Sequence, residues 1–157
     1  MATVLAAETP TTAPRYAPFP HHYEVWLEGR GSGGALLAPP RPVILGGAPA
    51  EFAGSDEWWS PEHLLLASAS LCLKATFDAL ARLKHLEVKR YHAGTRALLE
   101  RTPTGPAFTS ISIAVELEVA PADVERARSL LEKAKQHCIV ANSLKVEVQL
   151  EATVNGA

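Results

Sequence analysis

The sequence predicts an α+β fold with two helices among antiparallel strands, and three observations support this prediction. Two segments, residues 60–83 and residues 121–138, have the pattern of helices. The segments around them alternate apolar and polar side chains, and turns rich in glycine and proline separate these segments, as in hairpins. The order of elements is therefore β-β-(β)-α-β-β-α-β, which is an α+β arrangement.

The composition limits the number of domains and the classes of partner. The chain has 157 residues, enough for one domain with a sizeable core. Its 15 basic and 17 acidic residues argue against nucleic-acid binding, because phosphate neutralisation needs a clustered excess of lysine and arginine. No apolar run approaches the roughly 20 residues of a membrane span, and residues 1–7 lack the basic region of a signal peptide. We therefore expect a cytoplasmic protein that contacts no nucleic acid and no membrane.

The N-terminal segment is predicted to be a tail. Residues 1–20 contain four prolines among alanine and threonine and show little periodicity, which is typical of a flexible end. We therefore assign residues 21–157 to a single domain.

Three short strands are expected at the start of that domain. Residues 23–28 alternate apolar and polar side chains, as in a half-buried strand. Four glycines within residues 29–34 predict a turn, because glycine tolerates positive φ. The chain can then return through residues 35–37 and form a third strand at residues 41–45.

Two adjacent tryptophans, Trp58 and Trp59, end the loop that follows. Such residues either line an apolar pocket for a hydrophobic substrate or pack across an interface, and packing across an interface is the more common case.

A long helix is predicted from Ser60 to Leu83. Ser60 can cap it, Pro61 suits the first helical position, and Glu62 lies near the positive end of the helix dipole. From Leu64 onward the helix is apolar almost all round, so it has to be buried on most sides. One chain of this size would have difficulty covering such a helix, which indicates an oligomer.

The second half of the chain predicts a hairpin, an amphipathic helix and a last strand. A turn with two prolines and a glycine at residues 102–106 joins the two strands of the hairpin. Residues 121–123 open the helix, and Cys138 lies at its end. The strands are expected at residues 86–99, 108–119 and 145–151.

The two cysteines, Cys72 and Cys138, allow two interpretations. Free cysteine is among the most buried residue types, so an inert pair in the core is the simpler one. In the other, the two cysteines form a reactive pair. Two cysteines exclude a disulfide-rich scaffold and a four-cysteine zinc site, and we expect neither a metal nor a cofactor.

Two motifs around these cysteines resemble those of the OsmC/Ohr family, which is named for an osmotically inducible protein and an organic hydroperoxide resistance protein. Residues 60–72, SPEHLLLASASLC, resemble the family's first motif, in which a Pro-Glu pair precedes a cysteine. Residues 134–144, AKQHCIVANSL, resemble its second motif, "A-x-x-x-C-P-x-S-N-A-L". The resemblance covers roughly residues 23–154.

The resemblance implies an intertwined homodimer, in which antiparallel sheets from two chains wrap around the central helices. It also implies a thiol-dependent peroxidase that reduces organic hydroperoxides in a stress or detoxification role. Cys72 would be the peroxidatic cysteine and Cys138 the resolving one. The substrate would be a small hydrophobic peroxide, and the reductant a dithiol, for example of the lipoyl type.

Glu62 matches the carboxylate of the first motif, and the resemblance implies an arginine beside the reactive thiol. Glu62 and Cys72 are ten residues apart, which is a rise of about 15 Å on a straight helix. A shared site therefore requires Glu62 of the other subunit or a broken helix. The residues alone equally suit a Glu62 that only satisfies the helix dipole.

Arg30 is the candidate for this arginine. In the OsmC branch an arginine precedes the Pro-Glu motif in a stretch like R-F-E-G, but residues 51–54 read Glu-Phe-Ala-Gly here. The turn that carries Arg30 resembles the G-G-R-x-G turn of the Ohr branch, and Arg41 is a weaker candidate. An exposed turn residue is the simpler interpretation of Arg30. Without a cation near Cys72, the alternative function is a non-catalytic OsmC-like protein that binds a small apolar ligand at the dimer interface.

Overall fold

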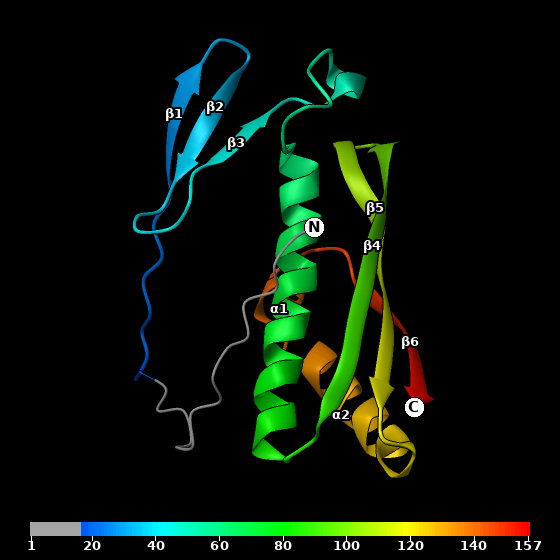
Figure 1. Ribbon diagram of the computed structural model, residues 1–157. Coiled ribbons are helices and arrows are strands. Elements are labelled where there is room, and N and C mark those ends of the chain that lie inside the picture. The colour runs from blue at the N-terminus through cyan, green and yellow to red at the C-terminus, as the bar shows by residue number, and fades with distance from the viewer. Residues whose placement is uncertain (1–16) are drawn as a thin grey trace.

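The computed structural model describes residues 17–157, which form two separate three-stranded sheets and three α-helices (Figure 1). The α+β class predicted from the sequence is confirmed. Residues 1–16 of the predicted tail lie outside the described part of the chain, and residues 17–20 are exposed.

The first sheet is antiparallel throughout, as predicted. Its first strand begins at Trp26 rather than at Tyr23. The turn between its first two strands is shorter than the run of four glycines predicts, because the strands remain paired as far as Arg30 and Gly33. Of these four glycines, only Gly31 has a positive φ. The strands are β1 Trp26–Arg30, β2 Gly33–Leu37 and β3 Ile44–Gly47, in the order β1-β2-β3.

Two glycines of this sheet serve close packing. A Cβ added to Gly33 would lie 2.1 Å from the Trp58 ring, and one added to Gly47 would lie 2.9 Å from it. No side chain fits at either distance, so the Trp58 ring packs directly on the glycine backbone of β2 and β3.

Helix α1, Pro61–Leu83, begins and ends where the sequence predicts. Ser60 has an extended backbone, and its hydroxyl oxygen accepts the backbone N–H of His63 at 3.1 Å, so the expected cap is formed. The helix buries one stripe of side chains, which are Ala69, Leu73, Phe77 and Ala81.

The second sheet packs against α1 and contains one parallel pair. Strands β4, Val88–Thr102, and β5, Gly105–Val119, form the predicted hairpin. Strand β6, Val148–Gly156, pairs with β5 in parallel, whereas the sequence analysis expected antiparallel strands only. The reason is the helix between them, which carries the chain back along the sheet before β6 begins.

That helix, α2, spans Val124–Gln136 and follows a short 3-10 turn, η2, at Pro121–Asp123. It ends two residues before Cys138, and a separate short helix, α3, spans Ile139–Asn142. The single helix expected as far as Cys138 is therefore interrupted. The buried side chains of α2 are Ala127, Leu130, Leu131 and Ala134.

The core lies between α1, α2 and the second sheet, and the first sheet takes no part in it. Figure 1 shows α1 beside β4 and β5, with β1, β2 and β3 on the other side of α1. Within the described residues, every buried hydrophobic side chain lies at Ala69 or beyond it in the chain. The large apolar side chains of the first sheet are exposed instead: Trp26, Leu27, Ile44 and Leu45.

Helix α1 is by length and composition apolar enough to cross a membrane. The expectation that no apolar segment approaches this length was therefore wrong. In this fold, however, α1 is a core helix, because one stripe of it is fully buried and it packs against α2, α3 and β4. Its opposite face is open, and Leu71 there is 69% exposed.

Candidate functional site

The two cysteine side chains meet where α1 passes the start of α3. Cys138 is buried and its Sγ donates to the backbone carbonyl of Ala69 on α1 at 3.9 Å. Ala69 lies one turn before Cys72 on α1, Cys72 is close enough to raise the pKa of the Cys138 thiol, and both thiols are free. Two residues 66 positions apart in the sequence thus form one thiol pair.

The two thiols differ in access to solvent. Cys138 is 1% exposed, whereas Cys72 is only half-buried. A molecule that approaches from outside therefore reaches Cys72 first.

Cys138 holds its proton more tightly than an ordinary cysteine. Burial raises the pKa of the Cys138 thiol, and the neighbouring Cys72 raises it further. The backbone N–H groups of Ala141 and Val140 act in the opposite direction but do not outweigh burial. The folded chain therefore favours the protonated thiol form of Cys138.

The interruption between α2 and α3 positions Cys138. The backbone N–H of Cys138 donates to the Lys135 carbonyl at 3.2 Å, and its own carbonyl accepts the N–H of Asn142 at 2.9 Å. The Asn142 side chain donates to the Gln136 carbonyl at 2.9 Å, which ties α3 to the end of α2. Asn142 is a positioning residue that the sequence analysis quoted within the second motif but did not single out.

Glu62 does not meet Cys72 within one chain. Helix α1 is continuous between them, so they are separated by about 15 Å along its axis. The broken helix that the sequence analysis left open is therefore excluded. One Glu62 carboxylate oxygen is buried without a hydrogen-bond partner, and none of the four ion pairs between the side chains that the structure describes includes Glu62. This oxygen would be stabilised by a donor from another chain.

The structure places the backbone of Arg30 at the tip of the first sheet, and its side chain lies outside the described part. Arg41 is exposed, and its guanidinium donates to the Ala38 carbonyl of its own loop at 3.3 Å. Arg41 is therefore held away from the thiols. Arg30 ends β1, and the turn that follows it lines one hollow together with Pro61 and Leu64 at the start of α1.

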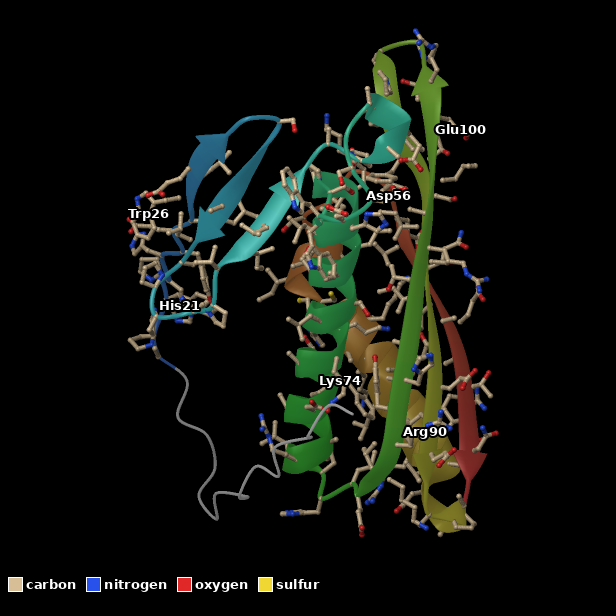
Figure 2. The ribbon with its side chains drawn as sticks, turned by 45° about the horizontal axis from the view of Figure 1, so that its top comes forward. His21, Trp26, Asp56, Lys74, Arg90 and Glu100 are labelled. Carbon is tan, nitrogen blue, oxygen red and sulfur yellow. The ribbon has the colours of Figure 1, made fainter. Side chains whose placement is uncertain are left out.

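Tyr91 on β4 is a polar residue near the thiols that the sequence analysis took only as a strand residue. Its ring centroid lies 5.9 Å from that of Phe77, and the Lys74 ammonium lies 5.0 Å from the ring centroid. Lys74, labelled on α1 in Figure 2, also pairs with Asp78 at 2.5 Å. The Tyr91 hydroxyl is buried and has no hydrogen-bond partner.

Two hollows lie on the first sheet and the start of α1 rather than at the thiols. One has a volume of about 430 Å³ and is lined by apolar side chains such as Leu36, Trp59 and Leu64 together with glycine backbone. The other, of about 620 Å³, is lined in part by Leu45 and Trp58. Both tryptophans therefore border hollows of a size that suits a small ligand.

One family model matches most of the chain, and one curated relative is similar to it. A family model described as OsmC-like protein matches residues 54–153. An uncharacterized protein of Bacillus subtilis (strain 168), YmaD, is 27% identical over 112 residues, which are 68% of this chain and 75% of that protein.

Solved structures show the same fold. An OsmC-like protein of unknown function from Vibrio cholerae has a TM-score of 0.77 at 15% identity, over 85% of this chain and 99% of that chain. An organic hydroperoxide resistance protein from Elizabethkingia anophelis has a TM-score of 0.68 at 17% identity, over 87% and 99%. The organic hydroperoxide resistance protein OhrB of Bacillus subtilis has a TM-score of 0.63 at 19% identity, over 85% and 98%. At these identities the structures establish the fold.

Alkaline unfolding should reveal the buried Tyr91 hydroxyl. Burial, together with the charges of Asp78 and Cys138, raises the pKa of Tyr91 from 10.0 to about 12. Between these values the unfolded chain has lost a proton that the folded chain keeps, so stability falls as pH rises from 10 to about 12. Tyr91→Phe should therefore lose less stability between pH 9 and pH 11 than the unmodified chain. The free energy of unfolding is measured with urea at both pH values.

The exposed Tyr23 provides the control. Tyr23→Phe makes the same chemical change on a side chain that is 85% exposed, and should leave the alkaline fall unchanged. An equal fall in the unmodified chain and in Tyr91→Phe would contradict the burial of this hydroxyl.

Proposed function

Because the chain belongs to the OsmC-like protein family, we propose that it is a thiol-dependent peroxidase that reduces organic hydroperoxides through Cys72 and Cys138. The observation that carries this proposal is the position of the buried Cys138 thiol beside the turn of α1 that holds the half-buried Cys72. The chemistry needs two thiols in contact, of which one is open to the substrate. Two of the similar structures are of organic hydroperoxide resistance proteins, which supports the same reaction class.

The reaction has two chemical steps on the protein. The Cys72 thiolate attacks one oxygen of the peroxide, the O–O bond breaks, and the alkoxide leaves and takes up a proton to become an alcohol. Cys72 is then a sulfenic acid. The Cys138 thiolate attacks its sulfur, an S–S bond forms, and the hydroxide leaves as water after taking up a proton. An external dithiol returns both cysteines to thiols by exchange and is itself oxidised to a disulfide.

The surroundings of the thiols favour an organic peroxide as substrate. Ile139, which follows Cys138, is 71% exposed. An open apolar side chain thus lies beside the thiols. It can bury the alkyl group of a hydroperoxide, whereas hydrogen peroxide has no such group.

We assign the active state to an intertwined homodimer, on three features of the single chain. The open face of α1, the exposed apolar side chains of the first sheet and the unpartnered Glu62 oxygen each lack a partner within the described residues. A second copy of the chain supplies apolar surface for the first two. It also supplies Arg30, whose guanidinium pairs with Glu62 of one chain and favours the Cys72 thiolate of the other chain.

A soluble fold and two free thiols are consistent with the cytoplasm, where thiols are kept reduced, and we place the protein there.

A second candidate function is the binding of a small apolar ligand without catalysis. The hollow of about 430 Å³ beside Trp59 favours it. The two candidates differ in whether added peroxide is consumed.

Single cysteine variants test the roles of the two thiols. Cys72→Ser should abolish the consumption of cumene hydroperoxide, because the attacking sulfur is gone. Cys138→Ser should still reduce one peroxide per chain and then stop, with a sulfenic acid on Cys72 that dimedone traps. Peroxide loss and the dimedone adduct are measured by mass spectrometry. Equal loss of the first turnover in both variants would contradict the assignment.

Charge variants test the proposed Arg30–Glu62 pair. Arg30→Ala should slow peroxide reduction about tenfold or more, because an opposite charge near a thiol shifts its ionisation by at least about one unit. Glu62→Gln should act in the same direction and more weakly. Arg41→Ala is the matched control and should have no effect, since Arg41 bonds to its own loop. A rate for Arg30→Ala equal to that of the control would exclude Arg30 from the site.

Sedimentation tests the dimer. The purified chain at micromolar concentration should sediment at about twice its monomer mass. Leu71→Glu puts a charge on the open face of α1 and should give monomers with an unchanged circular dichroism spectrum. Ala114→Glu, on the exposed outer side of β5, should remain dimeric. A monomeric unmodified chain would rule out the intertwined architecture.

A further inference from the structure

The open face of α1 is a strip of side chains that stays accessible in the single chain. Four side chains follow one another on this face at intervals of three and four residues: Leu64, Ser68, Leu71 and Ala75. Leu71 is 69% exposed, and Ser68 and Ala75 are exposed on either side of it. One large side chain between two small ones allows a second helix to approach this face closely.

The hollow of about 430 Å³ lies at the N-terminal end of this strip. Pro61 and Leu64 line it from α1, and Trp59, which is 51% exposed, lines it from the loop before α1. Most of the remaining lining is glycine backbone and leucine side chains of the first sheet. The hollow is therefore apolar and open, and it suits an apolar side chain from another chain.

The two ends of α1 differ in charge. The acidic loop, residues 48–60, precedes the helix, and Figure 2 shows Asp56 near the N-terminal end of α1. The charged residues of this loop are all acidic and exposed: Glu51, Asp56 and Glu57. Arg82 and Lys84 are exposed at the C-terminal end of α1. Among the described side chains, no ion pair includes any of these five residues, so both ends can pair with another chain.

The proposed site restricts how two copies of α1 can pack. It requires Glu62 of one chain beside Cys72 of the other, although these residues are about 15 Å apart along one helix. In a two-fold dimer with parallel helices, equal residues lie at equal levels, so Glu62 stays about 15 Å from the level of both Cys72 residues. With antiparallel helices, Glu62 and Cys72 can lie at the same level on both sides of the two-fold axis.

The antiparallel register also brings the strip, the hollow and the charges together. When Glu62 of the partner is level with Cys72, Leu71 is level with the first turn of the partner's helix, where the partner's hollow lies. Arg82 then lies about 15 Å beyond the partner's Glu62 along the helix axis, on the side where the acidic loop enters α1 (Figure 1). Parallel helices would instead place two acidic loops side by side, and like charges across an interface are unfavourable.

We infer that α1 of one chain packs antiparallel on α1 of a second copy, with Leu71 of each chain seated in the apolar hollow of the other and Arg82 facing the acidic loop. This packing rests on the dimer and the shared Glu62–Cys72 site of the proposed function, but not on the turnover of peroxide. The hollow is then filled by the protein itself and is closed to the ligand of the second candidate function.

Disulfide cross-linking distinguishes the two orientations. Each variant carries one new cysteine, Ser68→Cys or Ala75→Cys, in the chain with Cys72→Ser and Cys138→Ser. In the antiparallel register Ser68 lies beside the two-fold axis and faces its own copy, close to the roughly 6 Å between Cα atoms that a disulfide needs. The two Ala75 residues are about 24 Å apart along the axis. After mild oxidation, Ser68→Cys should give covalent dimers on a non-reducing gel, and Ala75→Cys should give monomers.

The alternative packings give other results. A parallel dimer would cross-link at both positions and would overturn the inference, as would a dimer that cross-links at neither position. Sedimentation of the same chains without oxidant separates the inference from the proposed function. Monomers would refute the proposed dimer together with this packing, whereas dimers in which Ala75→Cys cross-links would refute only the packing.

Charge reversal tests the contact between the ends of α1. Arg82→Glu places an anion opposite the acidic loop and should raise the dissociation constant of the dimer about tenfold at low salt, because the contact occurs twice in each dimer. Adding Glu51→Lys should restore the affinity. Arg96→Glu, on the exposed outer side of β4, is the matched control. Sedimentation equilibrium measures the constants, and equal values for Arg82→Glu and Arg96→Glu would overturn the contact.

Discussion

The burial of α1 is the constraint on which the rest of the structure depends. This helix of 23 residues is apolar on nearly every side, and a single sheet can cover one side only. The second sheet and α2 bury the stripe that contains Leu73 and Phe77. The chain that leaves α2 then passes α1 once more, and Cys138 comes to lie against Cys72 there. The thiol pair is thus a product of core packing rather than of a flexible loop.

The same constraint explains what the single chain leaves unsatisfied. The open face of α1 exposes Leu71, and the first sheet exposes its large apolar side chains because it packs on no part of the core. Glu62 begins the same helix with a buried carboxylate oxygen that lacks a donor. Exposed apolar surface and unpaired buried oxygen are both unfavourable in water, and a second copy would cover them together. The proposed dimer therefore follows from the packing of α1 as well as from the family.

Local signals in the sequence predicted most of the fold. Ser60 and Pro61 marked the start of α1 correctly, because capping depends on neighbouring residues only. The parallel pairing of β6 was not predicted, since it depends on the path of α2 and not on local pattern. The cysteines of the site were predicted from motifs, and the structure places Cys138 beside the turn of α1 that holds Cys72. Tyr91 was missed because alternation identifies a strand residue but not a hydroxyl that is buried without a hydrogen-bond partner.

The central claim is that Cys72 and Cys138 act as one redox pair. Intact mass spectrometry after addition of one equivalent of cumene hydroperoxide tests it most directly. The account predicts that each chain loses two hydrogen atoms and both titratable thiols, with one peroxide converted to alcohol per chain and full recovery of the thiols by a dithiol. Two intact thiols per chain beside unconsumed peroxide would contradict it.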